Sequence, residues 1–316
     1  TPPEITIRNA STSAPILPGQ LFNTPVTLAV SVTDATTPAQ TTHTVTVDGT
    51  PYGGGPVSGE GSHLVEVVAT DGAGNTATAS VGFVVDTIRP VFSALLPEHG
   101  SVGRTTPIAV SGRVSADTES VTVSGQPATC AGGAFSLAGV SLSEGPNDLL
   151  LVATDRAGNE ERTTLRVVLD TTNPSLTISS PADGALLGSL SLTVTGAATD
   201  ANLESVTVEG GAAALQPDGS FSRAGVTLVE GPGTLTATAR DRAGNTATTS
   251  VHVVADSLPP TVRITAPGPG AVLGQSPATV GGTAADAHLG SVTVNGVAAT
   301  VDDAGRFSAA VPLTEG

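Results

Sequence analysis

The sequence predicts an all-β protein built from several small β-sandwiches in tandem. Three observations lead to this fold class. Apolar and polar residues alternate over short runs, turn residues interrupt those runs, and one residue pattern recurs along the chain. The composition agrees, because 39% of the residues are hydrophobic but only 2% are aromatic, and Met and Trp are absent. Val, Leu, Ile and Ala therefore have to fill the interior, which suits several small cores better than one large core.

The predicted strands have a period of two. SLTVTGAATD (191–200), TLTATARD (234–241) and TTSVHVVAD (248–256) alternate between apolar and polar residues, as expected where successive side chains point to opposite faces of a sheet. The 38 glycines and 23 prolines supply turns between such runs. No stretch of useful length has a helical period. About seven short strands within each repeat are typical of a β-sandwich.

The phrase D-x-A-G-N marks an internal repeat. It begins at Asp71, Asp155 and Asp241, which are 84 and 86 residues apart. A second aspartate follows each phrase fifteen residues later, in VVDTIRP, VLDTTNP and VADSLPP, and a Glu-Gly pair precedes each phrase. The repeats divide the chain into four predicted domains, at residues 1–86, 87–170, 171–256 and 257–316.

The repeat resembles a known family. LSEGPNDLLLVATDRAGN (142–159), followed by VLDTTNP, is similar to tandem bacterial immunoglobulin-like repeats and to the immunoglobulin-like accessory domain of glucodextranase-type enzymes. The resemblance implies immunoglobulin-like β-sandwiches. It covers all four predicted domains, although the third has Gly233 where the second has Asn147, and the first is divergent, with a longer loop at 33–44. Such modules occur in adhesins, stalks and secreted enzymes, so the resemblance alone does not identify one function.

The linkers between the predicted domains are short. Each runs from an aspartate to a proline, from Asp86 to Pro90 and from Asp170 to Pro174. Proline restricts the backbone, and so few residues leave little room for a hinge. We therefore expect the immunoglobulin-like β-sandwiches to be arranged as an extended rod, in which each domain contacts only its neighbours.

The fourth predicted domain is shorter than the others. It stops at Gly316, which corresponds to Gly145 and Gly231, so it lacks the last two strands of the repeat. A sandwich without those strands exposes open edges and half of its core. We expect that the native chain continues or that another chain supplies these strands.

The D-x-A-G-N phrase is predicted to form the hairpin that joins two strands. Its aspartate can accept hydrogen bonds from the amides that follow, and its glycine can adopt the positive φ of a tight turn. This interpretation accounts for Gly74, Gly158 and Gly244 without a ligand. A phosphate-binding loop would need a following helix and usually a lysine, and the chain has neither a helical pattern nor a lysine.

Aspartates also suggest a cation at each junction between domains. In an immunoglobulin-like sandwich, the aspartate that ends one domain approaches two loops of the next domain. Three carboxylates at such a junction suit Ca²⁺, which takes six to eight oxygen ligands. The alternative is that each aspartate caps its own turn and faces water. The predicted ligands are Asp86, Asp117 and Asp155 at the first junction, Asp170, Asp200 and Asp241 at the second, and Asp256 and Asp286 at the third.

An active site is not expected. The five histidines fall at unrelated places in the repeats, and the glutamates of the Glu-Gly pairs occur once in each repeat, too far apart for an acid–base pair. The single cysteine, Cys130, is predicted to be a small core residue. Phe135, Phe221 and Phe307 stand at equivalent positions and are predicted to fill one core each.

The charge limits the possible partners. The formal net charge is −16 and all twelve basic residues are arginines without a basic cluster, so binding to nucleic acid is not expected. No apolar run is long enough to insert into a membrane. The sequence favours a non-catalytic structural or adhesive segment, a stalk or part of a fibre, outside the cell or on a bacterial surface. Its expected partners are copies of itself or other surface proteins.

The alternative function is an accessory, carbohydrate-associated array of a large secreted glycoside hydrolase. Carbohydrate sites usually present exposed aromatic side chains. The chain has one tyrosine, Tyr52, and no tryptophan. This composition favours the stalk, and a carbohydrate or cell-surface receptor would be bound through parts outside this segment.

Overall fold

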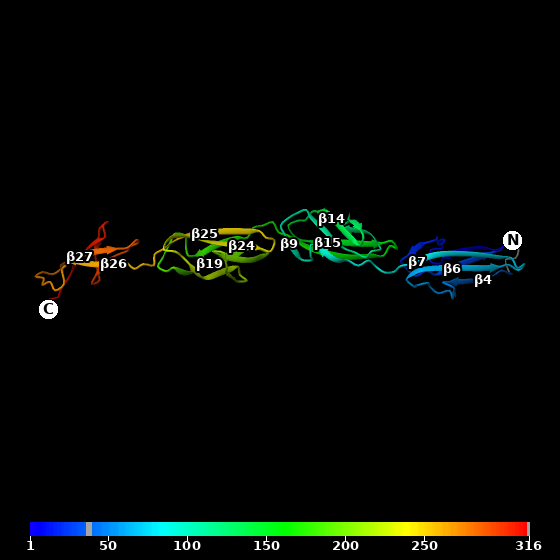
Figure 1. Cartoon of the computed structure of the whole chain (residues 1–316), viewed down its shortest axis with the longest axis horizontal. Helices are drawn as coiled ribbons and strands as arrows, with labels where there is room; N and C mark the ends of the chain where they lie inside the picture. Colours follow the sequence, from blue (N-terminus) through cyan, green and yellow to red (C-terminus); the bar gives the residue numbers. More distant parts are fainter. Residues whose placement is uncertain (36–39, 315–316) are drawn as a thin grey trace. The chain divides into compact units, whose positions relative to one another are not determined.

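Every element that the structure describes is a β-strand, which confirms the all-β prediction. The computed structural model describes residues 1–35 and 40–314. The chain forms two compact units, Thr1–Thr171 and Thr172–Gly316, and each unit is described by itself (Figure 1). Within the described residues, no helix is long and apolar enough to cross a membrane.

The first sandwich of unit 1 is asymmetric. One sheet contains only two antiparallel strands, β1 and β3, and the other has the order β2-β7-β6-β4-β5. The longer loop expected at 33–44 includes residues 36–39, which lie outside the described residues. The strands are β1 (Glu4–Asn9), β2 (Gln20–Phe22), β3 (Leu28–Thr33), β4 (Thr42–Val47), β5 (Thr50–Pro51), β6 (Gly61–Thr70) and β7 (Thr76–Val85).

The second sandwich of unit 1 has two full sheets, in the orders β13-β14-β10-β8 and β12-β11-β15-β16-β9. The short strand β9 runs parallel to β16, and the other pairings are antiparallel. The strands are β8 (Ser93–Leu96), β9 (Ser101–Gly103), β10 (Ile108–Arg113), β11 (Thr118–Val123), β12 (Gln126–Pro127), β13 (Thr129–Ala131), β14 (Ala134–Val140), β15 (Gly145–Asp155) and β16 (Glu160–Leu169).

The third sandwich, in unit 2, repeats this topology with the orders β17-β19-β23-β22 and β18-β25-β24-β20-β21. The strand lengths of the five-stranded sheet recur, as does its parallel edge strand, here β18 beside β25. The strands are β17 (Ser175–Ser180), β18 (Ala185–Leu187), β19 (Ser191–Thr199), β20 (Leu203–Val208), β21 (Gly211–Ala212), β22 (Ala214–Leu215), β23 (Ser220–Thr227), β24 (Gly231–Asp241) and β25 (Thr246–Ala255).

The fourth sandwich, which is also in unit 2, has one full sheet, in the order β26-β27-β31-β30, and a separate two-stranded hairpin, β28-β29. Apolar residues of β26 are left in solvent: Val262 is 59% and Ile264 is 57% exposed. The described part of this sandwich therefore has less core than the third. The strands are β26 (Thr261–Ala266), β27 (Ala278–Ala285), β28 (Thr293–Val294), β29 (Val297–Ala298), β30 (Thr300–Val301) and β31 (Arg306–Val311).

A phenylalanine fills each of the last three cores, as predicted. Phe135, Phe221 and Phe307 are all buried. Each ring lies opposite a glycine on the neighbouring strand, as Phe221 lies opposite Gly196. A Cβ atom at Gly196 would be 2.5 Å from the Phe221 ring and 2.1 Å from the Thr177 carbonyl oxygen, so only glycine leaves room for the ring.

The longest pair of strands in each complete sandwich forms a hairpin that reaches from one end of the domain to the other. These hairpins are β6–β7, β15–β16 and β24–β25, with β6 and β7 side by side in Figure 1. In β15–β16 the pairing runs from Gly145 opposite Leu169 to Thr154 opposite Glu160. The D-x-A-G-N phrase is the tip of each hairpin, and the linker to the next domain begins at its base.

Candidate metal centre

The D-x-A-G-N turn is built around its aspartate. At the tip of β15–β16, Asp155 Oδ1 accepts a hydrogen bond from the backbone N–H of Asn159 at 2.8 Å, and Oδ2 accepts one from Asn159 Nδ2 at 2.9 Å. Gly158 has φ = +90°, so it supplies the left-handed turn residue that was predicted. The tips at Asp71 and Asp241 have the same bonds. The aspartate therefore closes its own hairpin, as expected.

The three carboxylates predicted for the first junction come together within unit 1. Asp86, Asp117 and Asp155 each place one carboxylate oxygen within 4.8 Å of the others. Asp155 is buried at the hairpin tip, Asp86 is half-buried in the linker after β7, and Asp117 is exposed in the loop before β11. Three like charges at this separation repel one another unless a cation or protons compensate them.

Polar contacts fix the linker to the second sandwich. Asn159 Nδ2, which already bonds to Asp155, also donates to the backbone carbonyl oxygen of Asp86 at 2.7 Å. Further along the linker, the N–H of Val91 donates to Ser115 Oγ at 2.9 Å. From the first sandwich, Asn23 Nδ2 donates to the carbonyl oxygen of Gly158 at 3.3 Å. The hairpin tip thus holds the preceding linker as well as closing its own turn, which the sequence did not indicate.

The donor set of this cluster fits a hard cation. Besides the three carboxylates, the Oγ1 atom of Thr118 is enclosed and has no hydrogen-bond partner within the part of the chain that the structure describes. Thr118 follows Asp117 and pairs with Asp155 across the sheet. Ca²⁺ takes carboxylate oxygens together with carbonyl and water oxygens, and its flexible coordination tolerates a site that protein atoms fill only in part.

The residues predicted for the second junction lie in different units. Asp170 belongs to unit 1, where its N–H donates to the carbonyl oxygen of Gly103 at 2.9 Å. Asp200 and Asp241 belong to unit 2: Asp200 Oδ1 caps the N–H of Asn202 at 2.7 Å, and Asp241 closes the tip of β24–β25. Cation binding by these three residues stays a prediction.

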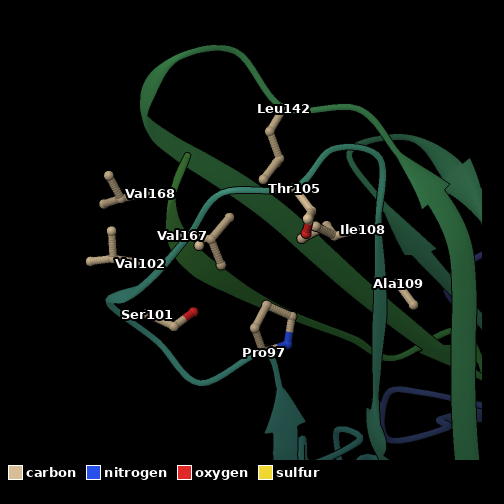
Figure 2. Close-up of a pocket in the computed structure, with 10 residues that line it drawn as sticks. Pro97, Ser101, Val102, Thr105, Ile108, Ala109, Leu142, Val167 and Val168 are labelled. Carbon is tan, nitrogen blue, oxygen red and sulfur yellow. The ribbon is translucent and has the colours of Figure 1, made fainter. Parts of the chain in front are cut away.

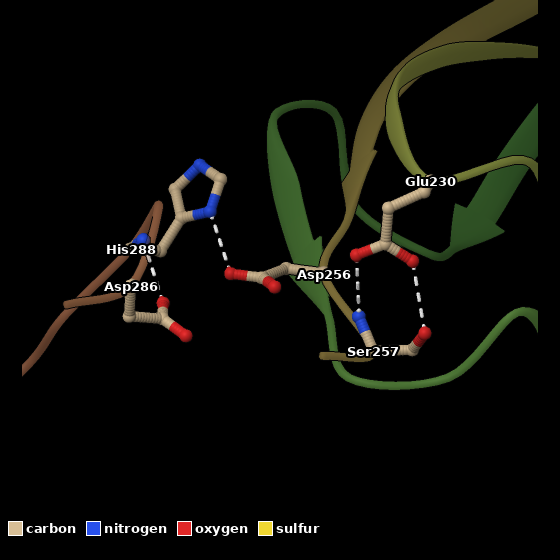
Figure 3. A network of polar contacts seen from close by, with 5 residues as sticks. All are labelled: Glu230, Asp256, Ser257, Asp286 and His288. Carbon is tan, nitrogen blue, oxygen red and sulfur yellow. Dashed lines mark hydrogen bonds and ion pairs between the residues drawn. The ribbon is translucent and has the colours of Figure 1, made fainter. Parts of the chain in front are cut away.

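The third junction, within unit 2, places a histidine between the predicted ligands. Asp256 Oδ2 lies 2.7 Å from Nδ1 of His288, and Asp286 Oδ1 accepts the backbone N–H of His288 at 2.8 Å (Figure 3). His288 was not foreseen, because the histidines showed no regular place in the repeats. At this junction an imidazole occupies the position beside the linker aspartate, so its donor set differs from that of the first.

A side pocket of the second sandwich gives no indication of catalysis. It has a volume of about 340 Å³, and its lining side chains include Pro97, Ile108, Leu142 and Val167 (Figure 2). None of the residues that line it is aromatic or titratable. This pocket therefore has neither the acid–base groups of a hydrolase nor the aromatic platforms on which sugars usually stack.

Cys130 has no special environment. It is half-buried and packs against the core of the second sandwich, opposite Phe135. This placement confirms the prediction of a small core residue.

One histidine–aspartate pair joins β6 to the residue after β4 in the first sandwich, and the aspartate side chain is 48% exposed. His63 Nδ1 lies 2.7 Å from Asp48 Oδ2, His63 Nε2 lies 2.7 Å from the carbonyl oxygen of Gly59, and the side chain is 11% exposed. Both partners only accept hydrogen bonds, so the imidazole needs a proton on each nitrogen. Burial alone would lower the pKa of His63, but the hydrogen bonds to Gly59 and Asp48 and the charge of Asp48 outweigh burial, and the pKa is raised.

We expect the first sandwich to lose stability as the pH rises from 6.5 through the pKa of His63 in the folded chain. The pKa of His63 is higher in the folded chain than the unfolded value of 6.5. The contribution of His63 to the free energy of unfolding is therefore complete below pH 6.5 and is lost as the pH rises through the folded pKa. Tyr52, the only tyrosine, packs in this core, so its fluorescence during urea unfolding reports this domain. A His63→Asn variant should unfold with little pH dependence between pH 6 and 9, because an asparagine side chain does not titrate. Asparagine suits this position, since Asn147 of the second sandwich makes the corresponding bond to the carbonyl oxygen of Ser143. The matched control is His43→Asn, at an exposed histidine of β4, and an unchanged pH profile in His63→Asn would contradict the assignment.

Comparison with known proteins identifies a relative in *Bacillus subtilis* (strain 168), bacillopeptidase F. It is 38% identical over 125 residues, which is 39% of this chain and 8% of the relative. The match therefore spans a small part of that protein's length.

Solved structures of tandem domains are similar at low identity. A tetra-tandem repeat from the extending region of a large adhesion protein is 22% identical, with a TM-score of 0.33, and the match covers 98% of this chain and 91% of that chain. Three titin domains, I67–I69, are 11% identical with a TM-score of 0.42, covering 80% and 98%. Fibronectin(III)-like modules of *Clostridium thermocellum* CbhA are 14% identical with a TM-score of 0.34, covering 52% and 93%.

A family model matches the chain three times in succession. The model describes glucodextranase domain B, and it covers residues 90–171, 174–257 and 260–316. These segments contain the second, third and fourth sandwiches and make up more than half of the sequence. The chain therefore belongs to the glucodextranase domain B family, as a tandem array of immunoglobulin-like domains.

Proposed function

We propose that this chain is a non-catalytic structural segment, a stalk or fibre-forming part of a larger extracellular or bacterial surface protein. The observation that carries the proposal is the fixed linker of unit 1. Asn159 and Ser115 of the second sandwich bond to the backbone of the linker that follows β7. A domain that holds the linker of its predecessor restricts the hinge between them. Restricted hinges suit a spacer that has to keep its length.

Calcium completes the proposed joint. Its cation would lie among the carboxylates of Asp86, Asp117 and Asp155. When bound, Ca²⁺ supplies charge compensation for the three aspartates. Extracellular modules bind Ca²⁺ with dissociation constants of about 10⁻⁴–10⁻³ M. A site of this class would be occupied where the Ca²⁺ concentration exceeds its dissociation constant.

We expect Ca²⁺ to bind the full chain and to raise the unfolding midpoint of the first sandwich, because unfolding withdraws Asp86 from the cluster. Binding only to the folded form stabilises it by about 2.7 kcal/mol at a Ca²⁺ concentration one hundred times the dissociation constant. Asp117→Asn should remove this gain and lower the calorimetric stoichiometry by one ion. It should not lower the Ca²⁺-free stability, because Asp117 is exposed and its replacement relieves repulsion among the three carboxylates.

The matched control for this test is Asp148→Asn, an exposed aspartate of β15 outside the cluster. It removes the same charge from the same domain and should retain the full Ca²⁺ response. A wild-type chain that shows neither calorimetric binding nor a shifted midpoint at millimolar Ca²⁺ would overturn the calcium proposal.

A second candidate function is an accessory array of a larger enzyme. It is favoured by the family, which is named for a domain of glucodextranase, and by the relative, which is named as a peptidase. Under this proposal the array spaces or presents a catalytic domain outside the segment. Affinity electrophoresis of the full chain in gels containing dextran tests whether this segment itself binds carbohydrate. Retarded migration supports a carbohydrate-associated array, and unchanged migration argues against carbohydrate binding by this segment.

A further inference from the structure

The glutamate of each Glu-Gly pair makes the same contacts. Glu144 Oε1 accepts the backbone N–H of Thr171 at 3.0 Å, and Oε2 accepts its hydroxyl at 2.9 Å. Glu230 accepts the N–H and the hydroxyl of Ser257 at 2.9 and 2.8 Å. Glu60 accepts the N–H of Thr87 at 3.1 Å and also its hydroxyl. The two partners are 27 residues apart in every case.

The hairpin register explains this spacing. Gly61 pairs with Val85, Gly145 with Leu169, and Gly231 with Ala255, so the preceding glutamate always lies at the hairpin base beside the departing linker. The first linker residue is Thr87, Thr171 or Ser257, and each offers an N–H and a hydroxyl. A carboxylate with two acceptor oxygens can take both donors at once. We call these three glutamates the linker latches.

Each latch holds the residue directly after a junction aspartate. Figure 3 shows this for Glu230: its carboxylate holds Ser257, while the neighbouring Asp256 points to His288 of the next domain. In unit 1, Glu60 holds Thr87 while Asp86 points to the cluster with Asp117 and Asp155. Two fixed donors on one linker residue restrict the backbone from which the aspartate side chain projects.

We propose that Glu60 and Glu230 are positioning residues that preorganise the junction aspartate for the next domain of the same unit, and that Glu144 fixes the linker residue after Asp170 in the same way. The proposal rests on the cation site proposed above for its metal readout. Residues that orient a metal ligand through hydrogen bonds commonly change metal affinity by about 10–100-fold when they are removed. A ligand held before binding loses less conformational freedom when the ion arrives.

The test compares Glu60→Ala with Glu60→Gln in the full chain. Alanine removes both acceptors, whereas glutamine can keep both bonds with one of them reversed: its carbonyl oxygen accepts the Thr87 N–H and its amide donates to the hydroxyl oxygen. We expect Glu60→Ala to weaken Ca²⁺ binding at the first junction by about 10-fold or more. The affinity is obtained from the Ca²⁺ dependence of the urea unfolding midpoint, followed by Tyr52 fluorescence. Glu60→Gln should recover most of the affinity. Glu66→Ala, at an exposed glutamate of β6, removes the same charge and should bind as wild type does.

A second measurement needs no metal. In Ca²⁺-free buffer, amide hydrogen exchange across residues 86–90 should be faster in Glu60→Ala than in wild type and Glu60→Gln. If wild type binds no Ca²⁺ but this exchange difference is found, the cation proposal fails and the latch stands as a device that fixes the linker. If Glu60→Ala changes neither exchange nor Ca²⁺ affinity, the latch is overturned. If Glu60→Gln behaves as Glu60→Ala does, the charge of Glu60 rather than its positioning is responsible, which also overturns the proposal.

Discussion

Replacing Asn159 by aspartate is expected to destabilise the second sandwich by about 4 kcal/mol at pH 7. The change replaces the Asn159 Nδ2 donor with an oxygen that faces Asp155 Oδ2 at 2.9 Å and the Asp86 carbonyl oxygen at 2.7 Å. Asn159 and Asp155 are both buried, at 8% and 1% exposure, so water screens the new repulsion poorly. Two unit charges 4 Å apart at an effective dielectric constant of about 20 interact by about 4 kcal/mol.

Cys130 makes this loss measurable for one domain. It is the only thiol and packs against the core of the second sandwich, so its labelling rate as a function of urea follows the opening of that domain. The destabilisation should shrink as the pH falls, because a shared proton relieves two facing carboxylates. The control, Asn173→Asp, adds the same charge at an exposed position. A labelling profile for Asn159→Asp that matches wild type would contradict the bridging role of Asn159.

Replacing Phe221 by alanine is expected to destabilise the third sandwich by about 3–5 kcal/mol. The ring is 2% exposed and lies against Gly196, which has no side chain to fill the space that the ring would leave. The cost therefore combines the lost burial of the ring with a cavity that collapses poorly. Hydrogen exchange in β24 and β25 measures the opening of this domain by itself.

The matched control for the core is Val229→Ala. Val229 lies in the same sandwich but is 84% exposed, so its truncation should change the stability by less than about 0.5 kcal/mol. Exchange protection in Phe221→Ala equal to that of the control would show that the ring does not support the core.

The repeated hairpin and the core phenylalanines could be predicted from the sequence because their signals are local. Alternation marks the strands, and Asp155 bonds to Asn159 only four residues away. The convergence of Asp86, Asp117 and Asp155 also followed, once the resemblance to immunoglobulin-like repeats fixed the strand directions. Their binding of calcium stays a prediction.

The latches were missed for the opposite reason. Glu60 and Thr87 meet only through the exact pairing register of β6 and β7, which alternation alone does not define. The bond between Asn159 and Asp86 could not be predicted for the same reason. The acceptor is a backbone carbonyl oxygen 73 residues away, and every residue has such an oxygen, so no sequence pattern identifies it. His288 occurs in a single repeat, so comparison of the repeats gave it no weight.

The β15–β16 hairpin has a consequence for how such chains lengthen. Its tip binds the linker before its domain through Asn159, and its base binds the linker after it through Glu144. One of these bonds ends on a backbone carbonyl, and the other needs only a threonine or serine. A gene segment that is duplicated from one linker to the next therefore carries both halves of a working joint. A chain that gains or loses one such segment keeps both kinds of bond at each remaining linker.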